Sequence, residues 1–137
     1  MSDRPSPIAP APVPGMPPAG ANVVVLRGVL SRDPEVRALP SGDALVTYEL
    51  TVRAAEGSPP ARAESVPVCW FDPPSTAHRL AAGDDVVVVG RVRRRFFRTG
   101  GATGSRTEVV ATRVVPARAA ARCRSAVESA LAGLDPG

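Results

Sequence analysis

The sequence predicts an all-β fold, a five-stranded barrel with one short helix between the third and fourth strands. Valine supplies most of the core-forming residues and aromatic residues make up only 4% of the 137 residues, a composition that favours strands. Five valine-rich stretches are separated by clusters of proline and glycine, which is how strands are separated by turns. The length allows one domain of roughly 100 residues between two ends of different composition.

The N-terminal end is rich in proline. Residues 1–20 hold seven prolines among alanine, serine and glycine, and such a segment buries too little apolar surface to offset the entropy of ordering it. We expect a disordered tail over residues 1–21, with a polyproline ligand for a partner as the functional alternative. The folded domain is then expected over residues 22–116.

The first two strands are expected at residues 22–31 and 44–53. Gly28 lies inside the first and marks the bend that closing a barrel requires. Proline and glycine between residues 33 and 43 indicate a loop. The second stretch alternates apolar and polar residues, which predicts a half-buried strand.

The third strand is expected at residues 64–72, at an edge or a bulge because it contains Pro67. Ser75 is a candidate N-cap for a short helix that ends at Leu80. A long fourth strand over residues 85–98, a flexible turn over 99–104 and a fifth strand over 105–115 follow. This order is that of the OB-fold barrel, whose strand faces and loops bind oligonucleotides.

Residues 117–137 are alanine-rich and predict an amphipathic helix followed by a short tail. The residues at helical spacing are Ala119, Cys123, Ala126, Val127, Ala130 and Leu131. We expect this helix to pack on its own barrel or on a second subunit, and a dedicated partner-binding helix is the alternative.

The fourth strand changes character along its length. Successive side chains point to opposite faces of a strand, so Arg91, Arg93, Arg95 and Phe97 form one row. The opposite face carries core candidates, namely Val86, Val88, Gly90 and Val92. A row of arginines ending in an aromatic ring can neutralise phosphates and stack a base. A solvated charged strand is the alternative.

Charge is concentrated in the same part of the chain. Residues 91–113 hold seven arginines and one acid, a net charge of +6, whereas the whole chain carries +4. Charge gathered in one segment marks a binding face better than an evenly basic chain does. All seventeen basic residues are arginine, which suits phosphate forks and stacking but also follows from genomic base composition.

Residues 22–116 resemble the bacterial single-stranded DNA-binding proteins, an OB-fold family. The stretch 33–37 followed by Pro40-Ser41-Gly42 resembles the first loop of the family, 86–97 its fourth strand, and 106–110 the opening of its last strand. The third strand, at 66–74, resembles an actinobacterial variant. The resemblance implies binding of single-stranded DNA without sequence specificity during replication, recombination or repair, by a homotetramer or a dimer.

The resemblance also implies site residues. Phe71 and Phe97 occupy positions where the family has stacking aromatics, whereas Ser65 and Glu56 occupy two further stacking positions and cannot stack a base. Trp70, one residue from Phe71, is expected in the core. Residues expected to track the DNA backbone are Arg53, Arg91, Arg93, Arg95, Arg98 and Arg106.

Two other functions stay open at this point. The missing aromatics allow an OB-fold protein-interaction module with weakened DNA affinity, and arginine with stacking does not by itself distinguish RNA from DNA. The chain stops without the acidic, phenylalanine-tipped tail by which members of the family recruit replication enzymes, so we expect no such recruitment.

The sequence gives little support to an enzyme, a metal site or a cofactor. His78 is the only histidine and the glycine-rich turn at 100–104 lacks the lysine of a phosphate loop. Cys69 and Cys123 are expected to stay reduced. No apolar run approaches the roughly 20 residues of a membrane span, and no signal peptide is evident. We therefore expect a cytoplasmic, nucleoid-associated protein with no membrane contact.

Overall fold

The computed structural model describes residues 15–53 and 63–134, without the side chain of His78. Most of the predicted N-terminal tail and Glu56 lie outside the described residues. The elements are β1 (Val24–Leu30), β2 (Glu35–Ala38), β3 (Ala44–Val52), β4 (Glu64–Phe71), the 3-10 helix η1 (Ser75–Arg79), β5 (Asp85–Thr99), β6 (Ala102–Pro116) and α1 (Ala120–Ala132).

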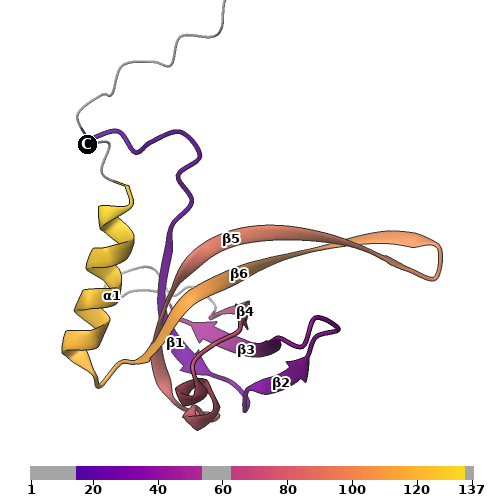
Figure 1. Cartoon of the computed structure of the whole chain (residues 1–137), viewed down its shortest axis with the longest axis horizontal. Coiled ribbons are helices and arrows are strands. Elements are labelled where there is room, and N and C mark those ends of the chain that lie inside the picture. The colour runs from indigo at the N-terminus through magenta and orange to yellow at the C-terminus, as the bar shows by residue number, and fades with distance from the viewer. Residues whose placement is uncertain (1–14, 54–62, 135–137) are drawn as a thin grey trace, which may run out of the picture.

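Five of the strands close into a barrel, which confirms the predicted fold class (Figure 1). Their order is β1-β5-β6-β4-β3, and β3 returns to β1 through the pair Leu30 and Leu50. The pairing of β4 with β6 is parallel and covers only Val68 and Cys69 of β4. Pro67 therefore lies where one side of β4 has no partner strand among the described residues, as a proline in a strand requires.

The sequence-based prediction missed one strand. Residues 35–38 were expected in a loop but form β2, which pairs antiparallel with the outer edge of β3. The strand has four residues between Pro34 and Pro40 and all four are exposed, so it lacks the alternating burial by which strands are recognised.

Gly28 lies where β1 exchanges one neighbouring strand for another. β1 pairs with β5 from Val24 to Val29 and with β3 at Val29 and Leu30. A Cβ atom at Gly28 would lie 2.4 Å from the carbonyl oxygen of Thr51. The close approach of the two backbones at the closure therefore requires glycine here.

Valine and leucine side chains from all five barrel strands fill the interior. η1 contributes Ala77, and Leu80 directly follows it. Trp70 is in this core, as predicted, because it faces away from Phe71 on a regular strand. The predicted cap of the short helix is wrong: Pro74 occupies the N-cap position, Ser75 is the first helical residue, and no side chain caps η1.

α1 packs on the outside of its own barrel, as the first of the two expected arrangements. Ala126 is buried against Val87, Val89 and Val115 of β5 and β6. Four of the other predicted contact residues surround this cluster, namely Ala119, Cys123, Val127 and Ala130. Leu131 does not take part and is exposed.

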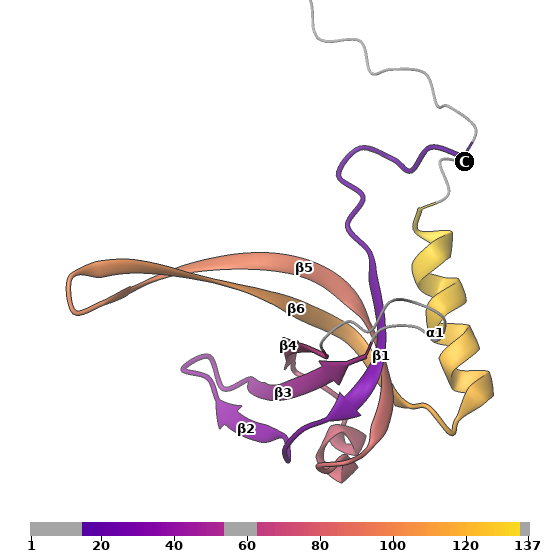
Figure 2. The ribbon, with the colours of Figure 1, turned by 180° about the vertical axis from the view of Figure 1, so that it is seen from behind.

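β5 and β6 continue beyond the barrel as one long hairpin (Figures 1 and 2). The strands have 15 residues each and are joined by Gly100 and Gly101, whose φ angles of 57° and 84° suit a two-residue turn. The predicted six-residue turn is therefore too long. Val92, expected in the core, is 44% exposed because the hairpin has already left the barrel at that residue.

Candidate nucleic-acid interface

The register of the hairpin gives it two chemically different faces. Cross-strand pairs place Arg93 opposite Glu108, Arg95 opposite Arg106 and Phe97 opposite Gly104. Directly paired residues lie on the same face of a sheet. We call this the outer face of the hairpin, which consists of Arg91, Arg93, Arg95, Phe97, Gly104, Arg106 and Glu108.

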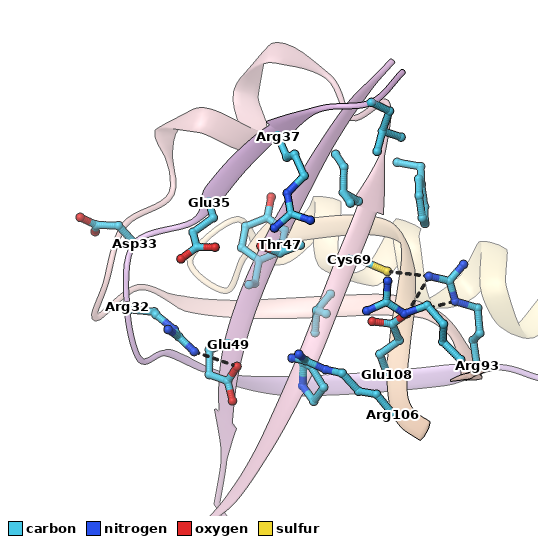
Figure 3. A pocket seen from close by; sticks show the side chains of 17 residues that line it. Arg32, Asp33, Glu35, Arg37, Thr47, Glu49, Cys69, Arg93, Arg106 and Glu108 are labelled. Carbon is cyan, nitrogen blue, oxygen red and sulfur yellow. Dashed lines mark hydrogen bonds and ion pairs between the residues drawn. The ribbon is translucent and has the colours of Figure 1, made fainter. Parts of the chain in front are cut away.

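Near the barrel the outer face borders a groove of about 340 Å³ (Figure 3). Residues from β2, β3, β4, β5 and β6 line it, so the curved sheet itself forms the hollow. Of the predicted site residues, the groove brings together Phe71, Arg93, Arg95 and Arg106.

The other four predicted residues do not line the groove. Arg91 and Phe97 share its face but lie outside its lining, and Arg98 is on the opposite face of the hairpin, paired with Thr103. Arg53 directly follows β3 and is exposed. The predicted set is therefore only partly a single surface.

Glu108 is the residue whose importance the sequence did not reveal. Its side chain is only 7% exposed. One of its oxygens accepts two hydrogen bonds from Arg93, 2.6 Å from Nη2 and 3.2 Å from Nε, and lies 3.6 Å from Nε of Arg95. A single buried carboxylate thus offsets part of the charge of the two central arginines.

Arg93 also contacts the first predicted stacking residue. Its guanidinium carbon lies 5.3 Å from the centroid of the Phe71 ring, a cation–π distance, and its Nη2 lies 3.7 Å from the Cys69 sulfur. Phe71 remains 38% exposed. Arg93 therefore connects β5 with both β4 and β6, and it shares Phe71 with any base that stacks there.

Phe97 lies against the facing strand. A Cβ atom at Gly104 would come within 2.7 Å of the Phe97 ring, so the ring covers the glycine, as aromatics do across strand pairs. Phe97 is nevertheless 42% exposed. The ring rests on the β6 backbone at Gly104 while part of its surface stays open to a ligand.

The two sides of the groove differ in their balance of charge, because three acids accompany Arg32 and Arg37 on one side whereas Glu108 accompanies three arginines on the other. Asp33, Glu35 and Glu49 lie across the groove from Arg93 and Arg106 (Figure 3). Glu49 is 3.4 Å from Arg32 and also accepts the hydroxyl of Ser65. Ser65 therefore makes a polar contact at a position where the family has a stacking aromatic. The basic side of the groove is the β5–β6 side.

Two buried groups near the groove are held in their neutral forms. Burial raises the pKa of the Cys69 thiol, and the charge of Glu108 raises it further. Burial also raises the pKa of the Tyr48 phenol well above its usual range. Neither group carries charge at neutral pH, so arginines and carboxylates set the field of the groove.

Two further properties bear on ligands. Within residues 15–53 and 63–134 no three histidine, cysteine, aspartate or glutamate side chains gather as metal ligands would. None of the helices in that part of the chain combines the length and apolarity needed to cross a membrane.

Comparisons with known proteins agree with the fold. The model of the Single-strand binding protein family matches residues 21–116. A single-stranded DNA-binding protein of Thermus thermophilus is 37% identical over 75 residues, which are 54% of this chain and 28% of that protein.

Two solved structures are also similar. The wild-type single-stranded DNA-binding protein of Thermus aquaticus superposes with a TM-score of 0.56 at 29% identity, covering 69% of this chain and 39% of that one. A deletion mutant of the same protein gives a TM-score of 0.55 at 31% identity, covering 69% and 40%. The matched part spans less than half of each relative. Because the family match covers the whole barrel and hairpin, the chain belongs to the Single-strand binding protein family.

Proposed function

We propose that this protein binds single-stranded DNA without sequence specificity and without chemistry. The family is one of non-enzymatic DNA-binding proteins. The observation that carries the proposal is the continuous surface formed by the outer face of the hairpin and the groove, where arginines flank Phe71 and Phe97. The arginines neutralise phosphates while the two rings stack bases.

The balance between stacking and charge follows from the residues present. Each stacked base contributes roughly 1–3 kcal/mol, with little dependence on sequence because every base has a flat face. Ser65 supplies no ring, so charge accounts for a larger share of the affinity. Binding is then steeply salt-dependent, with a logarithmic slope of about −0.7 for each phosphate neutralised.

The wider role is part of the proposal. Residues 22–116 act as the DNA-binding unit, which protects exposed single strands in the cytoplasm during replication, recombination or repair. A dimer or tetramer places several barrels on one strand, which raises avidity without any new contact.

The experiment that tests this function is the double substitution Phe71→Ala with Phe97→Ala. Loss of two stacked bases lowers affinity for a labelled oligothymidine by roughly 10²-fold or more, measured by fluorescence anisotropy. Leu131→Ala is the matched control, since Leu131 is an exposed apolar side chain on α1. An unchanged affinity of the double variant contradicts the stacking mechanism.

A protein-interaction module is the second candidate. The observation that favours it is the mixed lining of the groove, which contains five arginines and four carboxylates. A groove of mixed charge suits a polypeptide partner better than a polyanion. Weak binding of oligothymidine that shows no preference over a duplex favours this candidate, and competition by RNA of the same sequence tests for an RNA ligand.

A further inference from the structure

The second face of the hairpin carries its own arginine and aromatic pair. We call it the inner face because it continues the side of β5 and β6 that faces the barrel core. It consists of Val92, Arg94, Phe96 and Arg98 from β5, with Thr107, Ser105 and Thr103 of β6 opposite the last three of these.

Phe96 is the most exposed aromatic side chain that the structure describes. It is 66% exposed, against 42% for Phe97 and 38% for Phe71. Exposing a phenylalanine ring to water is unfavourable. On the same face of β5, Val86 and Val88 are fully buried in the barrel core. The face therefore changes from buried to exposed where the hairpin leaves the barrel.

Arg94 is held beside this ring. Its guanidinium carbon is 5.5 Å from the Phe96 centroid, and its Nη2 donates to the Ser105 hydroxyl at 3.0 Å. The guanidinium is thus positioned by a neutral partner and keeps its charge available. Arg93 on the outer face, by contrast, is paired with Glu108.

The inner face has no acid to offset its arginines. Its seven residues include Arg94 and Arg98 and otherwise hold only hydroxyl, apolar or aromatic side chains. Such a surface complements a polyanion, and an exposed ring beside a positioned guanidinium is the arrangement that stacks a base next to its phosphate.

We propose that the inner face is a second contact surface for single-stranded nucleic acid, with Phe96 stacking a base and Arg94 and Arg98 neutralising phosphates. The inference rests on the proposed function and extends it. One hairpin would then contact two stretches of single-stranded nucleic acid, one on each of its faces. The turn at the end of the hairpin is Gly100-Gly101, so no side chain of the turn obstructs a nucleic acid that passes from one face to the other.

The test places an indole on each face in turn. Phe96→Trp and Phe97→Trp proteins are titrated with an oligothymidine of about 16 nucleotides, the upper end of the site size of one OB fold. Stacking on a base quenches indole fluorescence. Trp70 supplies the same core background in every protein, and Leu131→Trp on α1 is the control for quenching away from the hairpin.

The proposal expects quenching of the Phe96→Trp protein that decreases with salt, and a smaller quench when Arg94→Gln is added. Phe96→Ala should also weaken binding of the same oligonucleotide roughly tenfold. Quenching of the Phe97→Trp protein alone overturns the second surface and leaves the proposed function standing. Quenching of neither hairpin protein, or equal quenching of Leu131→Trp, overturns the second surface and removes the support for stacking on the first.

Discussion

The same two strands have opposite roles in the barrel and in the projecting hairpin. From Val86 to Val89, β5 is buried on both faces, by the core on one and by α1 on the other. From Arg91 onward its side chains are exposed or half-buried. The comparison teaches that folding and the proposed DNA binding depend on different stretches of one continuous ladder, so substitutions can separate them.

The boundary between the two regions is a defined feature. Gly90 pairs with Ala111 and Val89 pairs with Arg113, so Thr112 is the extra residue of a bulge in β6. The Thr112 hydroxyl donates to the Val89 carbonyl at 3.1 Å. Bulges bend and twist a ladder, and this one lies where the ladder leaves the barrel.

Gly90→Ala should have the largest effect. It should destabilise the barrel, because Gly90 lies where the hairpin leaves the barrel. A Cβ atom there would lie 2.1 Å from the carbonyl oxygen of Val110 and 2.9 Å from the Cα of Ala111. Since both are backbone atoms, we expect a loss of about 3 kcal/mol in the free energy of unfolding, the upper range for overpacking. Urea denaturation followed by circular dichroism measures it.

Gly104→Ala is the matched control in the hairpin. Its Cβ atom would meet only the Phe97 ring, which can move toward solvent, so stability should change by less than about 1 kcal/mol. Equal losses of unfolding free energy for Gly90→Ala and Gly104→Ala would contradict the view that the barrel, and not the projecting hairpin, determines stability.

Removing charge from the hairpin should have the next largest effect, on binding alone. The variant Arg91→Gln, Arg95→Gln and Arg106→Gln keeps the Arg93–Glu108 pair, so the buried carboxylate stays paired. We expect the salt slope for oligothymidine to become shallower by about 2, which is 0.7 for each lost phosphate contact. Unfolding in urea should be unchanged within about 0.5 kcal/mol. A lower stability with an unchanged slope would place these arginines in the fold instead.

The sequence predicted the barrel well because its signals are local. Alternation identified β3, glycine identified the closure of β1, and the period of two placed Trp70 in the core and Phe71 outside it. β2 was missed because an exposed four-residue strand has no such pattern. The actinobacterial character of the third strand stays a prediction.

The site was less predictable because it depends on register between strands. Counting residues gave Glu108 as one acid among seven arginines, but only the pairing of β5 with β6 puts it under Arg93 and Arg95. Arg98 lies on the inner face because side chains alternate along β5, which the predicted set of contact residues did not take into account. The exposure of Phe96 could not be predicted either, because it depends on the hairpin extending past the barrel.

Glu108→Gln sharpens the comparison between the two faces of the hairpin. The substitution removes the negative charge that competes with phosphates for Arg93 and Arg95, so affinity for oligothymidine should rise by a few fold. Anisotropy at low salt measures it, and the gain should shrink as salt screens the charges. A weaker affinity would mean that Glu108 chiefly orients Arg93 for binding.

The smallest expected effect concerns the Cys69 thiol. The raised pKa of Cys69 means that the folded state favours its neutral form, so this contribution to stability is present below the unfolded pKa of about 8.5 and is lost as pH rises through the folded pKa. Cys69→Ala should therefore show a smaller fall in Tm at alkaline pH than the unsubstituted protein. An identical fall in both proteins would contradict this origin.

The central claim is that the hairpin and its groove bind single-stranded DNA. The most direct measurement is fluorescence anisotropy of a labelled oligothymidine with the unsubstituted protein at several salt concentrations, beside a duplex of the same length. The account predicts tight binding that prefers the single strand and weakens steeply with salt. Weak binding with no preference over the duplex would contradict it.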